Sequence, residues 1–347
     1  MVPFPKTRYG ASFEEISDLL SSWGEPTYRA RQVWDGLYRR RLPLEGLTDL
    51  PKTLRGRLAD ALPPALTPCV ETTGDHGLTT KWLWTAPGGT QVETVLMRYG
   101  DRATVCVSSQ AGCAMGCTFC ATGQAGFERH LAAGEIVEQV ARAAHASPQR
   151  LSNVVFMGMG EPLANYDATW DALCRLHDDF GISARHLTVS TVGVVPGMRR
   201  LAAGRLPVTL AVSLHAPDDA LRSELVPLNR RYPLAEVLDA AREYAAAKGR
   251  RLSFEYAMIA GVNDALEQAD ELARRLRPLA AHVNLIPLNP TAGFGVPASP
   301  PGQVARFAER LRQRGVNATV RRNRGTGIDA ACGQLRARQL SAPAVRG

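Results

Sequence analysis

Strand-like apolar patterns alternate with longer helical patterns from Ala103 onward. This alternation restricts the fold most strongly, because each strand–helix unit predicts one parallel strand with a helical crossover. The candidate strands are residues 104–108, 154–157, 186–190, 208–213, 252–258 and 282–286. Helical spacing of apolar residues marks residues 135–145, 234–244, 266–276 and 304–311. Six such units are too few for a closed eight-stranded barrel, so we expect an α/β fold, an open or partial (β/α)6 barrel, with its site at the carboxyl ends of the strands.

The domain organisation follows from where this pattern begins and ends. Ser12 and Glu15 have the spacing of a helix capping box, and the apolar residues behind them recur at helical spacing. Strand patterns around a Pro-Gly-Gly turn later predict a β-hairpin. We therefore expect a small basic helical domain (1–62), a linker with a β-hairpin extension (63–102), the partial barrel (103–340) and a flexible tail (341–347).

Positive charge suggests a polyanionic partner. The net charge is +8 and the isoelectric point about 9.3, and residues 29–57 hold eight basic side chains against three acidic ones. A solvated helix surface is the ordinary explanation of such charges, and a GC-rich genome would favour arginine over lysine. Neither accounts for the excess over Asp and Glu, so we expect residues 1–62 to bind RNA phosphates.

Cysteine use and hydropathy indicate the compartment. No apolar run reaches the ~18 residues of a membrane helix, and the first residues lack the apolar core of a signal peptide. We therefore expect a cytoplasmic protein without membrane contact, and nothing suggests more than a monomer. The seven cysteines would stay reduced there, which favours ligands or catalysis over disulfides and leaves one redox-active pair open.

Three cysteines lie close together as Cys113-x3-Cys117-x2-Cys120, with Phe119 before the last. Clustered soft thiolates suit either an iron–sulfur cluster or zinc. Four ligands would close a metal site, whereas three leave one iron of a [4Fe–4S] cluster open. A structural zinc site that includes Cys106 is the alternative, although the spacing lacks the paired Cys-x2-Cys units usual for zinc.

Polar motifs follow several of the predicted strands. Met-Gly-Met-Gly-Glu-Pro contains Gly160 and Glu161, and single polar residues follow the later strands. Taken singly, such residues are turn formers or caps. Several around one predicted rim favour a cofactor pocket; they are Gly160, Glu161, Ser190, Ser213, His215 and Asn289.

Three further residues gain no role from spacing alone. Cys332 follows a group of arginines in a glycine-rich stretch, where a lone cysteine is most often inert. Cys106 lies seven residues before Cys113, too far to be counted with the cluster on spacing. Glu93 belongs to an alternating strand and would be taken for a surface carboxylate.

Taken together, these motifs resemble the RlmN/Cfr family of radical S-adenosylmethionine (SAM) methyltransferases, which methylate adenine in RNA. The similar segments are Cys-Val-Ser-Ser-Gln-x-Gly-Cys-x3-Cys-x2-Cys, Met-Gly-Met-Gly-Glu-Pro, Ser-Leu-His-Ala and Asp-Ala-Ala-Cys-Gly. They occur in the family order, and the resemblance extends from the basic N-terminal helices to Gln334. It implies a [4Fe–4S] cluster and SAM as cofactors.

The resemblance also implies a role for each site residue. The cluster ligands would be Cys113, Cys117 and Cys120, and the SAM contacts Gly160, Glu161, Ser190, Ser213, Leu214, His215 and Asn289. Cys332 would carry the methyl group as S-methylcysteine, Glu93 would accept the ring proton, and Cys106 would resolve the RNA adduct, leaving a disulfide with Cys332.

The implied substrates are an adenosine of 23S rRNA and, in dual-specificity members, an adenosine beside the tRNA anticodon. The implied reaction is methylation of adenine C2, with an electron donor such as flavodoxin or ferredoxin. Two alternatives stay open. One is a relative that methylates C8 of adenine with the same cysteines, and the other is a non-enzymatic, zinc-containing RNA-binding protein.

Overall fold

The computed structural model describes residues 6–279, 281–291, 293–321 and 323–335. The expected flexible tail, 341–347, lies outside these residues. No helix in the described ranges is long and apolar enough to cross a membrane.

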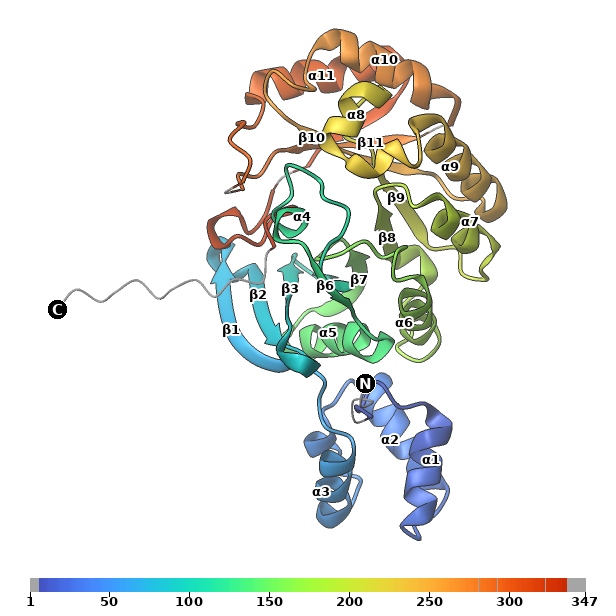
Figure 1. Ribbon diagram of the computed structural model, residues 1–347. Coiled ribbons are helices and arrows are strands. Elements are labelled where there is room, and N and C mark those ends of the chain that lie inside the picture. Colours follow the sequence, from blue (N-terminus) through green and yellow to red (C-terminus); the bar gives the residue numbers. More distant parts are fainter. Residues whose placement is uncertain (1–5, 280, 292, 322, 336–347) are drawn as a thin grey trace, which may run out of the picture.

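Three helices form the N-terminal part, α1 (Phe13–Ser22), α2 (Tyr28–Tyr38) and α3 (Lys52–Ala61), at the foot of Figure 1. The predicted capping box is confirmed, because Ser12 Oγ accepts from Glu15 N at 3.2 Å and Glu15 Oε2 accepts from Ser12 N at 3.0 Å. Trp34 Nε1 donates to Asp179 Oδ1 at 3.0 Å. This hydrogen bond joins α2 to the end of a helix of the barrel region.

Ten strands form one sheet in the order β1-β2-β3-β4-β7-β8-β9-β10-β11-β12. Neighbours are antiparallel from β1 to β4 and parallel from β4 to β12. The strands are β1 (Thr67–Gly74), β2 (Thr79–Thr85), β3 (Gln91–Arg98), β4 (Arg102–Cys106), β7 (Arg150–Phe156), β8 (Leu187–Thr191), β9 (Thr209–Ser213), β10 (Ser253–Met258), β11 (His282–Pro287) and β12 (Asn317–Val320).

Helices line the outside of the curved parallel part of the sheet (Figure 1). They are α5 (Ala133–Ala146), α6 (Tyr166–Asp178), α7 (Val195–Ala203), α9 (Leu234–Lys248), α10 (Leu266–Leu276) and α11 (Pro301–Gln313). Two short helices are α4 (Ala121–Ala125), near the centre of the view, and α8 (Asp219–Leu225), in its upper part. Their apolar stripes face the sheet. In the predicted helical range 304–311 of α11, for example, the buried residues are Val304, Phe307, Ala308 and Leu311. The α/β partial-barrel fold expected from the sequence is confirmed.

Several features of the ten-stranded sheet differ from the sequence prediction. Residues 67–74 form strand β1, which was not expected because this mostly polar edge strand lacks a clear alternation. Strand β12 adds a seventh parallel strand. Strand β4 pairs antiparallel with β3 and parallel with β7, so the hairpin extension and the barrel share one continuous sheet.

Candidate active site

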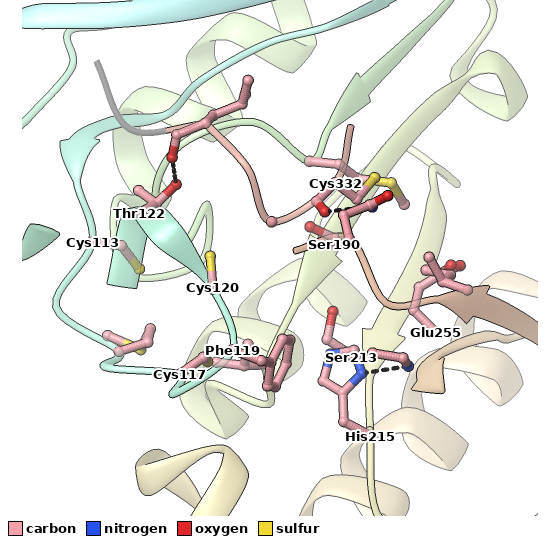
Figure 2. Close-up of a pocket in the computed structure, with 18 of the residues that line it drawn as sticks. Cys113, Cys117, Phe119, Cys120, Thr122, Ser190, Ser213, His215, Glu255 and Cys332 are labelled. Carbon is pink, nitrogen blue, oxygen red and sulfur yellow. Dashed lines mark hydrogen bonds between the residues drawn. The ribbon is translucent and has the colours of Figure 1, made fainter. Parts of the chain in front are cut away.

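One cavity at the carboxyl ends of the parallel strands gathers most of the residues singled out from the sequence (Figure 2). In a parallel sheet these strand ends lie at one edge, so residues far apart in the chain meet there. Ten of the thirteen expected site residues line the cavity: Cys113, Cys117, Cys120, Gly160, Glu161, Ser190, Ser213, His215, Asn289 and Cys332. Leu214, Cys106 and Glu93 do not.

A short hairpin, β5 (Gln110–Gly112) with β6 (Phe127–His130), closes the cysteine loop. Gly112 has a φ of +71°, and a Cβ there would come within 2.0 Å of Gly126 O, so only glycine allows this approach. Thr118 N donates to Leu225 O at 3.1 Å, which ties the loop to α8. The loop thus holds its three cysteines against the cavity.

The chemistry of these cysteines fits an iron–sulfur cluster. Burial raises the pKa of Cys113 to about 12 and that of Cys117 well above its usual value, so their thiolates need a nearby positive charge such as iron. Each cysteine of a cluster binds a different iron, so the three sulfurs need not converge. Among the described residues, no group of three or more His, Cys, Asp or Glu side chains is gathered around a single point.

Glu161 is held rigidly at the end of the turn after β7. Its Oε1 accepts from Leu163 N at 3.0 Å and its Oε2 from Val192 N at 2.9 Å. Burial raises the pKa of Glu161 to about 7, against the lowering effect of these two N–H donors. Gly160 has a φ of +97°, and a Cβ there would lie 2.5 Å from Gln110 Cβ. The Gly-Glu turn therefore packs directly on the strand that precedes the cysteine loop.

His215 presents a neutral ring to the cavity. Its Nδ1 accepts from Ala257 N at 3.0 Å, which assigns the proton to Nε2. Burial, and secondarily the Arg222 charge, lowers the pKa of His215 to about 3. The ring of Phe119 packs edge-on at 4.8 Å between centroids. Leu214, next to it, points into the hydrophobic core instead, so its side chain does not reach the cavity.

Cys332 lines the cofactor cavity and also a smaller adjoining cavity, which Cys106 lines as well. Asn289 Nδ2 donates to Cys332 O at 2.9 Å. Burial raises the pKa of Cys106 to about 12, and nearby Cys332 acts in the same direction. All seven cysteines lie among the described residues and have free thiols. The structure therefore brings Cys106 and Cys332 to one place without joining them.

Glu93 lies apart from both cavities, on β3. Its side chain is 2% exposed and pairs with Lys81 Nζ at 2.9 Å. The surface position expected from composition is therefore wrong. Lys81 Nζ also donates to Asp329 O at 3.2 Å, three residues before Cys332. Through Lys81, Glu93 is linked to the loop that carries this cysteine.

Sequence reasoning missed three charged residues around the cavity. Glu255 and Arg321 line it, and Arg222 on α8 is fully buried beneath its rim. Arg222 donates to Val192 O at 2.6 Å, Leu214 O at 3.1 Å and Asn229 Oδ1 at 2.7 Å. Glu255 and Arg222 are single charged residues in otherwise ordinary strand or helical patterns, which resemble surface positions, so the sequence carried no signal for them. Arg321 belongs to the group of arginines before Cys332, to which the sequence assigned no role in the cavity.

Several known proteins are similar to this chain. The radical SAM superfamily model matches residues 107–276. Two relatives named probable dual-specificity RNA methyltransferase RlmN come from Frankia alni (55% identical over 342 residues, 94% of this chain and 82% of the relative) and Chloroflexus aurantiacus (52% over 348 residues, 95% and 92%). A solved structure of a radical SAM methyltransferase from Sphaerobacter thermophilus has a TM-score of 0.92 at 50% identity, covering 96% of this chain and 100% of that one.

The family resemblance of the motifs is thus confirmed over nearly the whole chain, and the protein belongs to the RlmN family of dual-specificity RNA methyltransferases within the radical SAM superfamily.

Proposed function

We propose that this protein methylates C2 of an adenosine in 23S rRNA and of an adenosine beside the anticodon in tRNA, with Cys332 carrying the methyl group. The observation that carries the proposal is the position of Cys332. It lines both the cavity of the three clustered cysteines and the smaller cavity of Cys106. A residue that receives a group from a cofactor and passes it to a substrate needs access to both.

Membership of the superfamily implies a [4Fe–4S] cluster and SAM. Cys113, Cys117 and Cys120 would hold the cluster, and the rim residues Gly160, Glu161, Ser190, Ser213, Leu214, His215 and Asn289 would contact SAM. Leu214 can do so only through its backbone, since its side chain is in the core. When bound, these groups supply the methyl group and one-electron radical chemistry.

Cys332, Cys106 and Glu93 would together allow methylation of a carbon atom that is a poor nucleophile. C2 of adenine is electron-poor and does not attack a SAM methyl group as an ordinary nucleophile would. Cys332 would therefore accept the methyl group first. Its methyl carbon would then lose one hydrogen atom through the radical chemistry that the bound cofactors supply, and would bond to C2, with the odd electron returning to the bound cofactors. Glu93 would remove the ring proton. Attack by the Cys106 thiolate on the sulfur of Cys332 would break the sulfur–carbon bond and leave a Cys106–Cys332 disulfide. The electron pair of the broken bond would stay on the carbon attached to C2, which takes up a proton and becomes the methyl group of the released RNA.

The sheet register supports a joint role for Glu93 and Cys106. Val95 on β3 pairs directly with Cys106 on β4. Glu93 lies two residues before Val95, and side chains two apart on a strand point to the same face. Glu93 and Cys106 therefore belong to the same face of neighbouring strands.

The remaining parts of the chain would serve this reaction. We assign residues 1–62 to RNA binding, 63–102 to a connector, and 103–340 to the catalytic barrel. The protein would act as a monomer in the cytoplasm, reduced by flavodoxin or ferredoxin. Exposed arginines of α2 and its C-terminal end, among them Arg31, Arg39 and Arg40, support the RNA-binding assignment.

The proposal is tested by Cys332→Ala, with Cys174→Ala as the matched control because Cys174 lies on α6 away from both cavities. Methyl transfer to unmodified 23S rRNA transcript and the iron content are measured under anaerobic conditions. We expect Cys332→Ala to retain iron and lose transfer completely, and Cys174→Ala to retain both. Turnover by Cys332→Ala would rule out the thioether carrier.

A further inference from the structure

One carboxylate of the cofactor cavity has no role in the reaction described above. Glu255, on β10, is 5% exposed and lines the cavity. In Figure 2 its side chain lies across the cavity from Cys113 and Cys120, on the side of Ser213 and Cys332. It is therefore remote from the proposed cluster ligands and close to the proposed methyl carrier.

The two oxygens of Glu255 have different surroundings. Oε1 accepts from Ser253 Oγ at 3.1 Å and from Asn284 Nδ2 at 2.8 Å, which fixes the orientation of the carboxylate. Oε2 is buried and makes no hydrogen bond. Arg321 Nη1 is 4.0 Å from Oε2, a distance too long for a hydrogen bond. A buried carboxylate oxygen without a donor is unfavourable, so this atom is the expected place for a ligand donor.

The sheet register identifies the neighbours that such a ligand would also meet. Glu255 pairs directly with Ser213 of β9 on one side and with Asn284 of β11 on the other. Directly paired residues of neighbouring strands present their side chains side by side on one face. Ser213, which also lines the cavity, and Glu255 thus form a short polar row.

The chemistry of SAM limits which of its groups can fill this position. Its amino and carboxylate groups would bind the open iron, on the side of the three cysteines. The part that extends across the cavity is the adenosyl group, whose hydrogen-bond donors are the two ribose hydroxyls and the adenine amine. A carboxylate that hydrogen-bonds vicinal ribose hydroxyls is a recurring solution in nucleotide sites.

We propose that Glu255 Oε2 accepts hydrogen bonds from the ribose hydroxyls of SAM, with Ser213 beside it. The inference rests on the proposed placement of SAM in this cavity. Because Cys332 lines the same side, the contact would hold the sugar, and its C5′ atom, at a fixed distance from the sulfur that carries the methyl group. Glu255 is thus a SAM-binding residue that also positions the cofactor.

The test is SAM binding to the anaerobic, cluster-containing protein by isothermal titration calorimetry. The ligands are SAM and an analogue lacking both ribose hydroxyls. A hydrogen bond to a charged group stabilises binding strongly, and its loss lowers the affinity about tenfold or more. We therefore expect the wild-type protein to bind the analogue about tenfold or more weakly than SAM, and Glu255→Gln to bind SAM with a similar loss.

The analogue should bind Glu255→Gln and the wild-type protein equally, because the missing hydroxyls leave Glu255 no partner. Ser253→Ala is the matched control, because it removes a hydrogen-bond donor to Glu255 Oε1 and leaves Oε2 unchanged. This variant should bind SAM with an affinity within about twofold of wild type. Equal affinities of the wild-type protein for SAM and for the analogue would overturn the inference. This comparison does not depend on whether any variant folds. If the analogue still binds Glu255→Gln more weakly than the wild-type protein, Glu255 Oε2 contacts another group of SAM, such as the adenine amine, and the ribose assignment is wrong. Wild-type protein that binds no SAM would instead refute the proposed function.

Discussion

At the scale of single residues, the loop that carries Cys332 is tied to both sides of the cofactor cavity. Asn289 Nδ2 holds Cys332 O, and Ala121 N, directly after the cysteine cluster, donates to Gly333 O at 2.8 Å. Lys81, on β2, donates a hydrogen bond from Nζ to Asp329 O. The loop is therefore held by Ala121, which directly follows the proposed ligand Cys120, and by Lys81, which pairs with the proposed base Glu93.

Replacing Cys106 separates the two halves of the proposed reaction. In Cys106→Ala, Cys332 should still form its bond to adenine, but no thiol remains to resolve it. We expect a covalent RNA–protein adduct that persists in denaturing gels under reducing conditions. The exposed Cys69, changed to alanine, serves as the control and should give none. Free methylated product from Cys106→Ala would remove Cys106 from the scheme.

The buried neutral ring of His215 predicts an acid-sensitive fold. Its pKa falls from 6.5 to about 3 on burial, so the unfolded chain binds the extra proton between these values and stability is lost as the pH falls below 6.5. At pH 5 this amounts to ~2 kcal/mol. Urea unfolding of the cluster-free protein at pH 5 and 7.5 should show a smaller pH difference for His215→Gln than for wild type. An equal difference would show that His215 does not contribute.

Residue identities in the site could be predicted where a motif carries the chemistry. The cysteine spacing and the polar residues after the strands led to nine residues of the cavity, and the family resemblance added Cys332. Glu255 and Arg222 could not be predicted, because their importance comes from burial against carbonyls and neighbouring strands. The strand pattern predicts a surface position for Glu93 because it contains no sign of the partner Lys81, which lies on the adjacent strand.

At the scale of elements, the short helix α8 connects the cysteine loop to the strand ends. Its last residue, Leu225, accepts from Thr118 N within the loop. Arg222, one turn earlier, binds the carbonyls that follow β8 and β9. Burial lowers the pKa of Arg222 to about 10, so it stays charged at neutral pH. One buried cation thus braces the loops that hold the proposed SAM contacts.

Arg222→Leu should destabilise the protein strongly. The substitution leaves buried carbonyls without donors, at a cost of ~3 kcal/mol or more. Arg199→Leu is the control, because Arg199 forms an exposed pair with Glu243 and such pairs contribute ~0.5 kcal/mol. Urea unfolding of the cluster-free variants gives the comparison. Equal stability of the two variants would contradict a bracing role for Arg222.

The main elements of the barrel could be predicted because their apolar periodicity is strong. The β1 strand and the β5–β6 hairpin could not. Strand β1 is an edge strand of mostly polar residues whose structure depends on its pairing with β2. The three-residue strand β5 is too short for any period to appear, and it is defined by a close glycine contact across the hairpin.

At the scale of the whole molecule, the N-terminal helices and the barrel share one hydrophobic core. Tyr38 packs edge-on against Phe180 at 5.8 Å, and Arg175 Nη1 donates to Tyr9 O at 2.8 Å. The helices are therefore held firmly against the barrel, while the side chains of Arg31 and Arg39 stay exposed. RNA bound by these arginines would have a defined position relative to the cavity.

Substitution of these arginines should weaken RNA binding without affecting the cysteine chemistry. Arg31→Gln with Arg39→Gln should reduce the slope of log affinity against log salt concentration by about 0.7 for each phosphate that the protein no longer neutralises. Methylation of Cys332 should not change. The control pair is Arg242→Gln with Arg274→Gln, on α9 and α10 at the opposite end of the molecule (Figure 1). An equal reduction for both pairs would indicate a general charge effect.

The central claim is that the methyl group passes through Cys332 as a carbon that loses one hydrogen. Anaerobic turnover with SAM carrying a fully deuterated methyl group tests it most directly, by mass spectrometry of the methylated adenine. We expect a product methyl group that has lost one deuterium and is attached to C2. A methyl group that keeps all its deuterium would show direct transfer and contradict the roles of Cys332 and Cys106. Label at C8 would keep the mechanism and contradict the proposed position of methylation.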